Sequence, residues 1–207
     1  MILKILTIFL LLTNYLTASN QNFFNEAKIH FEKKDFNNIN PQLTKFQIDS
    51  VIALYSSGQI KEAINAYGRI GRHACKIALA KNNIEIVAIN DLTDNETLAH
   101  LFKYDSAYGT YKKEVKAGKD SITIGANRIK VFAEKNPKKL PWKKLKVDVV
   151  LECTGVFRTK KDASLHIKAG AKKVLISAPA KGDGVSSYVK GVNHKNIDST
   201  QIIFDNA

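Results

Sequence analysis

The sequence predicts an α/β fold: a doubly wound (Rossmann) parallel sheet, preceded by a short helical segment. Two observations carry this prediction. From residue 60 onward, apolar runs of strand length alternate with amphipathic stretches of helix length. The runs at 84–89, 147–152 and 173–177 are apolar enough to form parallel strands buried on both faces.

The first 19 residues form a signal-like hydrophobic segment. Lys4 gives it a positive start, residues 5–12 are apolar except for Thr7, and Thr17-Ala18-Ser19 offers small residues for cleavage. The run is too short for a stable membrane span. A buried N-terminal helix is the alternative interpretation, and export of the protein depends on which of the two is correct.

Residues 20–58 have a different character, with aromatic and aliphatic residues at helical spacing on either side of Pro41. The pattern resembles tetratricopeptide-type helical hairpins. Because one such unit cannot bury its own apolar face, this segment is expected to be marginal alone. It could pack on the neighbouring domain, bind a partner, or be an unrelated piece joined to it.

The elements of the main domain can be placed in order from residue 60. The first strand is expected at 60–65, although Glu62 is an unusual residue for a strand buried on both faces. A helix at 72–81 and a strand at 84–89 follow, and Asp94 is expected to cap a helix ending at Lys103. The remaining expected elements are strands at 113–117, 121–124, 128–133, 147–152, 173–177, 188–192 and 201–204 and helices at 140–145 and 162–169.

A glycine motif joins the first strand to the first helix. Gly68 and Gly71 match the second and third glycines of G-x-G-x-x-G, and Asp91 follows Gly71 by 20 residues. Such a motif places a pyrophosphate on the backbone amides of a helix N-terminus, with the acid on a ribose. Ala66 stands where the first glycine belongs, and Gly68 and Gly71 alone would also fit an ordinary turn.

The charge balance is strongly basic, with 32 Lys and Arg against 19 Asp and Glu and a net charge of +13. The densest lysines are Lys135, Lys138, Lys139, Lys143, Lys144 and Lys146. No nucleic-acid-binding signature accompanies them, so a solvated surface is favoured over a nucleic-acid partner. The two cysteines, Cys75 and Cys153, are too few for a disulfide framework and lack metal-ligand spacing, so no metal site is expected.

Six motifs together resemble the NAD-binding half of phosphorylating glyceraldehyde-3-phosphate dehydrogenase, over residues 60–207. They are Ala63-Ile64-Asn65-Ala66-Tyr67-Gly68-Arg69-Ile70-Gly71-Arg72, Ala88-Ile89-Asn90-Asp91-Leu92, Leu101-Phe102-Lys103-Tyr104-Asp105-Ser106, Glu152-Cys153-Thr154-Gly155-Val156-Phe157, Ser177-Ala178-Pro179-Ala180-Lys181 and Gly191-Val192-Asn193-His194. The resemblance implies NAD as the cofactor, since a carboxylate at Asp91 disfavours the additional phosphate of NADP.

The resemblance also implies a set of cofactor-binding residues. Gly68, Arg69, Ile70 and Gly71 would form the turn that binds the pyrophosphate. Asp91 would bind the adenine-side ribose, and Lys135 would lie beside the adenine. Thr154 and Gly155 would border the cofactor at the end of the central strand, and Ser177 would lie on the nicotinamide side. A serine at a strand end often only caps a turn, which is the alternative for Ser177.

The sequence departs from the family at its catalytic cysteine. The family places that cysteine in a Ser-Cys-Thr-Thr-Asn run, whereas this sequence stops at Asp205-Asn206-Ala207, and neither Cys75 nor Cys153 occupies the nucleophile position. We therefore expect an NAD-binding fragment with no catalytic residue of its own, cytoplasmic by resemblance and without the family's homo-oligomer. The alternative is a non-catalytic module that presents a vestigial Rossmann domain to a protein or RNA partner.

Overall fold

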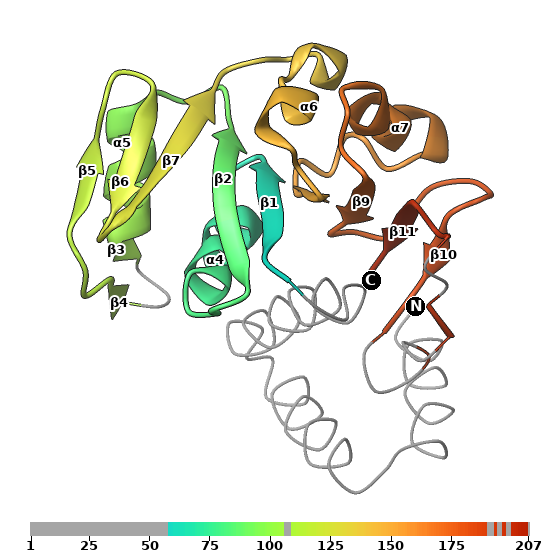
Figure 1. Ribbon diagram of the computed structural model, residues 1–207, viewed down its shortest axis with the longest axis horizontal. Helices are drawn as coiled ribbons and strands as arrows, with labels where there is room; N and C mark the ends of the chain where they lie inside the picture. Colours follow the sequence, from blue (N-terminus) through green and yellow to red (C-terminus); the bar gives the residue numbers. More distant parts are fainter. Residues whose placement is uncertain (1–57, 106–108, 190–192, 194–195, 198–199, 207) are drawn as a thin grey trace, which may run out of the picture.

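The computed structural model describes residues 58–105, 109–189, 193, 196–197 and 200–206 (Figure 1). The predictions for the signal-like segment and for the tetratricopeptide-like segment concern residues that lie almost entirely outside these ranges. Within the described residues, no helix is both long enough and apolar enough to cross a membrane.

Six parallel strands form the centre of the sheet and confirm the doubly wound α/β prediction. They are β1 (Ile60–Asn65), β2 (Ile84–Asn90), β7 (Asn127–Phe132), β8 (Val149–Glu152), β9 (Lys173–Ile176) and β11 (Ile203–Asp205), arranged in the order β7-β2-β1-β8-β9-β11. Strand β1 lies between β2 and β8, so the winding direction reverses there. In an open α/β sheet, the crevice at the carboxyl ends of the strands beside such a reversal is where ligands bind.

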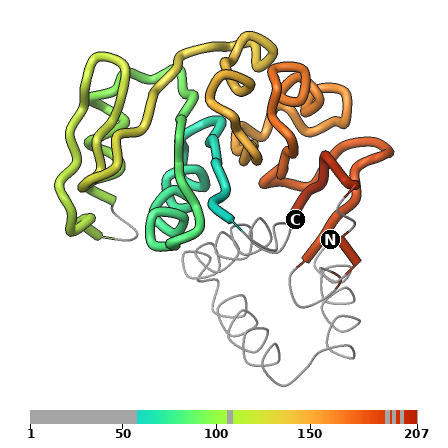
Figure 2. The backbone as a smooth tube through the Cα atoms, in the orientation of Figure 1, coloured from blue at the N-terminus to red at the C-terminus, as the bar shows by residue number. Residues whose placement is uncertain are grey.

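Shorter strands extend the sheet at both ends (Figure 2). β5 (Val115–Ala117) and β6 (Ser121–Ile124) continue antiparallel from β7, and β10 (Ser186–Ser187) pairs in parallel with β11. A separate antiparallel pair is formed by β3 (Tyr104–Asp105) and β4 (Gly109–Thr110).

The helices divide between the two faces of the sheet and create two cores. Helices α4 (Arg69–Ala78) and α5 (Asn95–Lys103) bury Cys75 and Phe102 against Ile64 on one face. The 3-10 turn η1 (Pro137–Lys139) and helices α6 (Trp142–Leu145) and α7 (Lys160–Lys168) cover the other. There Trp142 and Ala163 pack in one cluster with strand residues of that face. Both faces of β1, β2, β8 and β9 are thus covered, as their apolar composition requires.

Most elements differ from their predictions by a few residues, and three of the differences are instructive. Helix α4 begins at Arg69 rather than at residue 72, because the chain turns into the helix directly after Gly68. Helix α6 begins only at Trp142, since Pro141 keeps the preceding Leu140 extended. The strand expected at 188–192 is replaced, within the described residues, by β10 at Ser186–Ser187, whose polar residues give no apolar signal.

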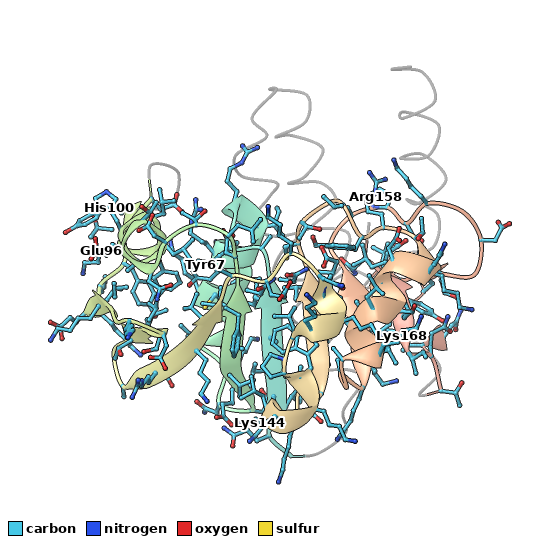
Figure 3. All side chains as sticks on the ribbon, turned by 90° about the horizontal axis from the view of Figure 1, so that it is seen from above. Tyr67, Glu96, His100, Lys144, Arg158 and Lys168 are labelled. Carbon is cyan, nitrogen blue, oxygen red and sulfur yellow. The ribbon has the colours of Figure 1, made fainter. Side chains whose placement is uncertain are left out.

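The lysine-rich surface lies on the layer of α6 and α7, where Lys144 and Lys168 are found (Figure 3). Lys138, Lys139, Lys143, Lys144 and Lys146 are all exposed to solvent. Their exposure is compatible with a solvated surface and with a binding surface alike.

Candidate functional site

The turn after β1 is held by two hydrogen bonds to the end of β2. The amide of Ala66 donates to the carbonyl of Asn90 at 2.8 Å, and the amide of Tyr67 donates to Asp91 Oδ2 at 2.7 Å. Ala66 has a φ of 71°, in the left-handed region that L-residues avoid. The missing first glycine of the motif therefore falls at the position where the turn needs one.

The N-terminus of α4 is suited to an anion. Gly68 is its N-cap, no side chain caps the first turn, and no acidic residue lies in that turn. The amides of Arg69 and Ile70 begin the helix without a described partner, so the positive end of the helix dipole is uncompensated. A phosphate group satisfies such amides directly.

Gly71 allows α4 to approach the turn this closely. A Cβ at Gly71 would lie 2.1 Å from the carbonyl oxygen of Ala66 and 3.0 Å from Ile64 Cγ2. Gly68 is the opposite case, because a Cβ there would meet no atom within 4 Å. Gly71 thus serves helix packing, whereas Gly68 leaves open space at the helix start.

Asp91 closes the site on the side of β2. Its Oδ2 accepts from Tyr67, and its Oδ1 accepts from the amide of Thr93 at 2.9 Å. Each carboxylate oxygen keeps a second lone pair, so Asp91 can also accept from the hydroxyl groups of a ligand.

A pocket of about 370 Å³ lies at the carboxyl ends of β1, β2 and β8. Three predicted site residues line it: Asp91, Lys135 and Thr154. Its other lining residues, which were not predicted from the sequence, are Asn65, Ala66, Asn90, Leu92, Glu134, Val156 and Phe157. For Asn65 and Asn90 a signal existed, since each is a polar residue that directly follows two apolar residues at the end of its strand.

The remaining predicted site residues do not line this pocket. Gly68, Arg69, Ile70 and Gly71 form the adjoining helix start. Gly155 lies in the turn after β8 with a φ of 71°. Ser177 follows β9, one strand farther from the reversal, where its side chain hydrogen-bonds to Cys153.

These features define a dinucleotide-binding Rossmann domain: a strand-reversal crevice, an uncapped helix N-terminus and an acid at the end of the second strand. Residues 60–160 match the family model described as "Glyceraldehyde 3-phosphate dehydrogenase, NAD binding domain". This part of the chain is therefore an NAD-binding domain of the glyceraldehyde-3-phosphate dehydrogenase type.

Several curated proteins that are similar to this chain are named glyceraldehyde-3-phosphate dehydrogenase. The glyceraldehyde-3-phosphate dehydrogenase of Clostridium pasteurianum is 49% identical over 147 residues, covering 71% of this chain and 44% of that protein. The Mycoplasma pneumoniae enzyme is 49% identical over 154 residues, covering 74% of this chain and 46% of that protein. The chloroplastic enzyme of Chondrus crispus is 47% identical over 140 residues, covering 67% of this chain and 34% of that protein. The chain thus spans less than half the length of these relatives.

The strained turn at Ala66 leads to a first prediction. Ala66→Gly is expected to stabilise the fold by about 1 kcal/mol and to tighten NAD binding by up to about tenfold. The substitution removes the left-handed strain, which raises the fraction of molecules with a competent turn, and it removes a Cβ from the pocket lining. Urea unfolding and calorimetric NAD titration measure the two effects.

Lys146→Gly is the matched control. Lys146 also has a positive φ, of 54°, but it is the exposed C-cap of α6 and does not line the pocket. It should gain stability without any change in NAD affinity. Equal affinities of the Ala66→Gly variant and the unmodified protein would show that the turn accepts alanine at no cost to binding.

Proposed function

We propose that NAD binds across the crevice with its pyrophosphate on the amides of Arg69 and Ile70 and its adenine-side ribose on Asp91. The observation that carries this proposal is the uncapped N-terminus of α4 beside a carboxylate whose oxygens retain free lone pairs. Lys135 would lie on the adenine side, and Thr154 and Gly155 would border the cofactor at the end of β8. Ser177 would serve the nicotinamide side.

Discrimination between NAD and NADP tests this placement. NAD should bind at least about tenfold more tightly than NADP, because the 2′-phosphate would approach the negative charge of Asp91. Asp91→Asn keeps the shape of the side chain and removes the charge. The preference for NAD over NADP should therefore fall to a few-fold. Calorimetric titration with both nucleotides measures it.

Glu134→Gln controls for a general effect of charge, because Glu134 is a second acid lining the same pocket. It should retain the preference for NAD. If Glu134→Gln relaxed the preference as much as Asp91→Asn, the selectivity would come from the net field of the pocket. Absence of binding by both nucleotides would refute the proposed function itself.

For the whole reaction, we propose that this domain supplies the cofactor site of a phosphorylating glyceraldehyde-3-phosphate dehydrogenase. In that reaction a cysteine thiolate adds to the aldehyde, hydride passes from the adduct to NAD, and phosphate releases the acyl group as 1,3-bisphosphoglycerate. The proposal rests on the matched family model and on the relatives' shared name.

The two cysteines of this sequence are poorly suited to be the nucleophile. Cys75 is fully buried on α4, and burial raises the pKa of its thiol to about 12. Burial also raises the pKa of Cys153 well above its ordinary value. Both remain protonated at neutral pH and are therefore unreactive. We assign the described residues a cofactor-binding role only.

Two further proposals follow from the same features. Both cysteines are free thiols, which fits a cytoplasmic location, with export through residues 1–19 as the alternative.

The exposed lysines on α6 are the one observation in favour of a non-catalytic RNA- or protein-binding module. We rank this second, since the aromatic residue of α6, Trp142, is fully buried and offers no platform for stacking a base.

A further inference from the structure

A chain of buried polar side chains begins at the pocket lining and joins five elements, β1, β2, β8, α6 and α7. Trp142 Nε1 donates to His166 Nδ1 at 2.9 Å, and His166 Nε2 lies 3.0 Å from Glu152 Oε2. Asn65 Nδ2 also donates to Glu152 Oε2, and Asn90 Nδ2 donates to Asn65 Oδ1 at 2.7 Å. All five side chains are at most 5% exposed. Such networks are costly unless every member is satisfied.

The bonding pattern fixes the tautomer of the histidine. The indole N–H of Trp142 can only donate, so His166 Nδ1 must accept and carries no hydrogen. The hydrogen of the neutral ring is therefore on Nε2, where it points at Glu152. Trp142 and His166 thus orient the carboxylate of Glu152 from α6 and α7.

The other oxygen of Glu152 holds the turn that forms one wall of the pocket. Glu152 Oε1 accepts from the amide of Thr154 at 2.7 Å and also from its hydroxyl group. Thr154 Oγ1 in turn accepts from the amide of Val156 at 3.0 Å. The hydroxyl group of Thr154 is occupied within the turn, and Val156 is left 71% exposed at the pocket.

We propose that Glu152 is a positioning residue for the cofactor pocket: it acts through Thr154 on the wall and through Asn65 on the floor, with His166 and Trp142 fixing its carboxylate. This inference rests on the proposed function, because it assigns the Glu152 network a role in NAD affinity. It also makes Trp142, the one tryptophan of the sequence, an internal reporter of pocket occupancy. The indole is fully buried and reaches the pocket lining through His166, whose ring lies beside Glu152 and edge-on to Phe157.

Three threonine variants of the full chain test the proposal without altering the buried carboxylate. Thr154→Val keeps the shape and the backbone bond but loses both bonds of the hydroxyl group, so NAD affinity should fall about tenfold. Thr154→Ser restores the hydroxyl group and should bind within about twofold of the unmodified protein. Thr97→Val is the matched control, because it removes a threonine hydroxyl that bonds to Asp94 on α5, outside the pocket lining.

Two readouts distinguish positioning from mere stability. Calorimetry with NAD should separate Thr154→Val from Thr97→Val, while urea unfolding should show a loss of stability in both. Saturating NAD should change the emission of Trp142 in the unmodified protein, and Thr154→Val should reduce that change by at least about half.

The outcomes separate this proposal from the proposed function. If the unmodified protein binds NAD but Thr154→Val binds equally well, the positioning role is refuted while NAD binding stands. An emission of Trp142 that NAD leaves unchanged would refute the positioning role in the same way. If the unmodified protein does not bind NAD at all, the proposed function fails and the positioning role fails with it.

Discussion

Glu62→Val is expected to stabilise the protein by roughly 3 kcal/mol at pH 7. Glu62 is fully buried in β1, and among the described residues neither of its carboxyl oxygens has a hydrogen-bond partner. Burial raises the pKa of Glu62 from 4.5 to about 8, so the folded protein holds it protonated at neutral pH. A pH of 7 lies 2.5 units above 4.5, the pKa of Glu62 in the unfolded state. Each of these units costs the folded state about 1.4 kcal/mol, which gives the expected gain.

The predicted gain depends on pH in a direction that identifies its cause. Below pH 4.5 the carboxyl group is protonated in both states, so it contributes no penalty. As the pH rises from 4.5 to about 8, only the unfolded state loses the proton, and stability falls. The advantage of Glu62→Val should therefore be small at pH 5 and should level off above pH 8 at roughly 5 kcal/mol.

Urea unfolding at pH 5, 7 and 8.5 measures this dependence. Glu62→Gln should remove the dependence of stability on pH that Glu62 causes. It should gain less stability than Glu62→Val, because the amide of glutamine stays buried without a partner. Glu85→Gln is the surface control: Glu85 lies beside Lys61 in the β1–β2 register, is exposed, and should change stability by less than about 0.5 kcal/mol. A stability difference between Glu62→Val and the unmodified protein that does not vary with pH would contradict the titration of Glu62.

The fold was predictable because its signals are local. Three apolar runs fell on β2, β8 and β9, and Asp94 caps α5 through the amide of Thr97, as expected. The prediction was less exact where polar residues or backbone constraints set the boundaries, as for β10 and for the start of α6. Pairing with β11 makes Ser186–Ser187 a strand, and no periodicity in the sequence encodes that pairing.

The site was predictable only where a short motif encodes it. The glycine turn and Asp91 have a fixed spacing, and the structure brings them together through the bond from Tyr67 to Asp91. The Glu152 network could not be predicted this way, because contacts such as His166 with Glu152 and Asn65 with His166 span 14 and 101 residues and form only when β1, β8 and α7 have packed. A buried polar cluster of this kind is a property of the tertiary structure, whereas the turn is a property of the chain.

Gly71→Ala is expected to cost at least about 2 to 3 kcal/mol of stability and to weaken NAD binding more than tenfold. The added Cβ would lie 2.1 Å from the carbonyl oxygen of Ala66, a backbone atom that cannot rotate away. That carbonyl is fixed because it shares a peptide plane with the amide of Tyr67, which donates to Asp91 Oδ2. Helix α4 must therefore shift outward, and its first amides leave the position where they would meet the pyrophosphate.

Gly68→Ala separates the packing role of a glycine from its role in binding. Gly68 has a φ of −70°, and a Cβ there meets no atom within 4 Å, so the fold should keep its stability within about 0.5 kcal/mol. The same Cβ would project into the space that the proposed pyrophosphate position requires, so NAD affinity should still fall. Urea unfolding and calorimetry on both variants give the answer. If Gly71→Ala were as stable as Gly68→Ala, α4 would have room to move, and the close approach at Ala66 would not be needed for the fold.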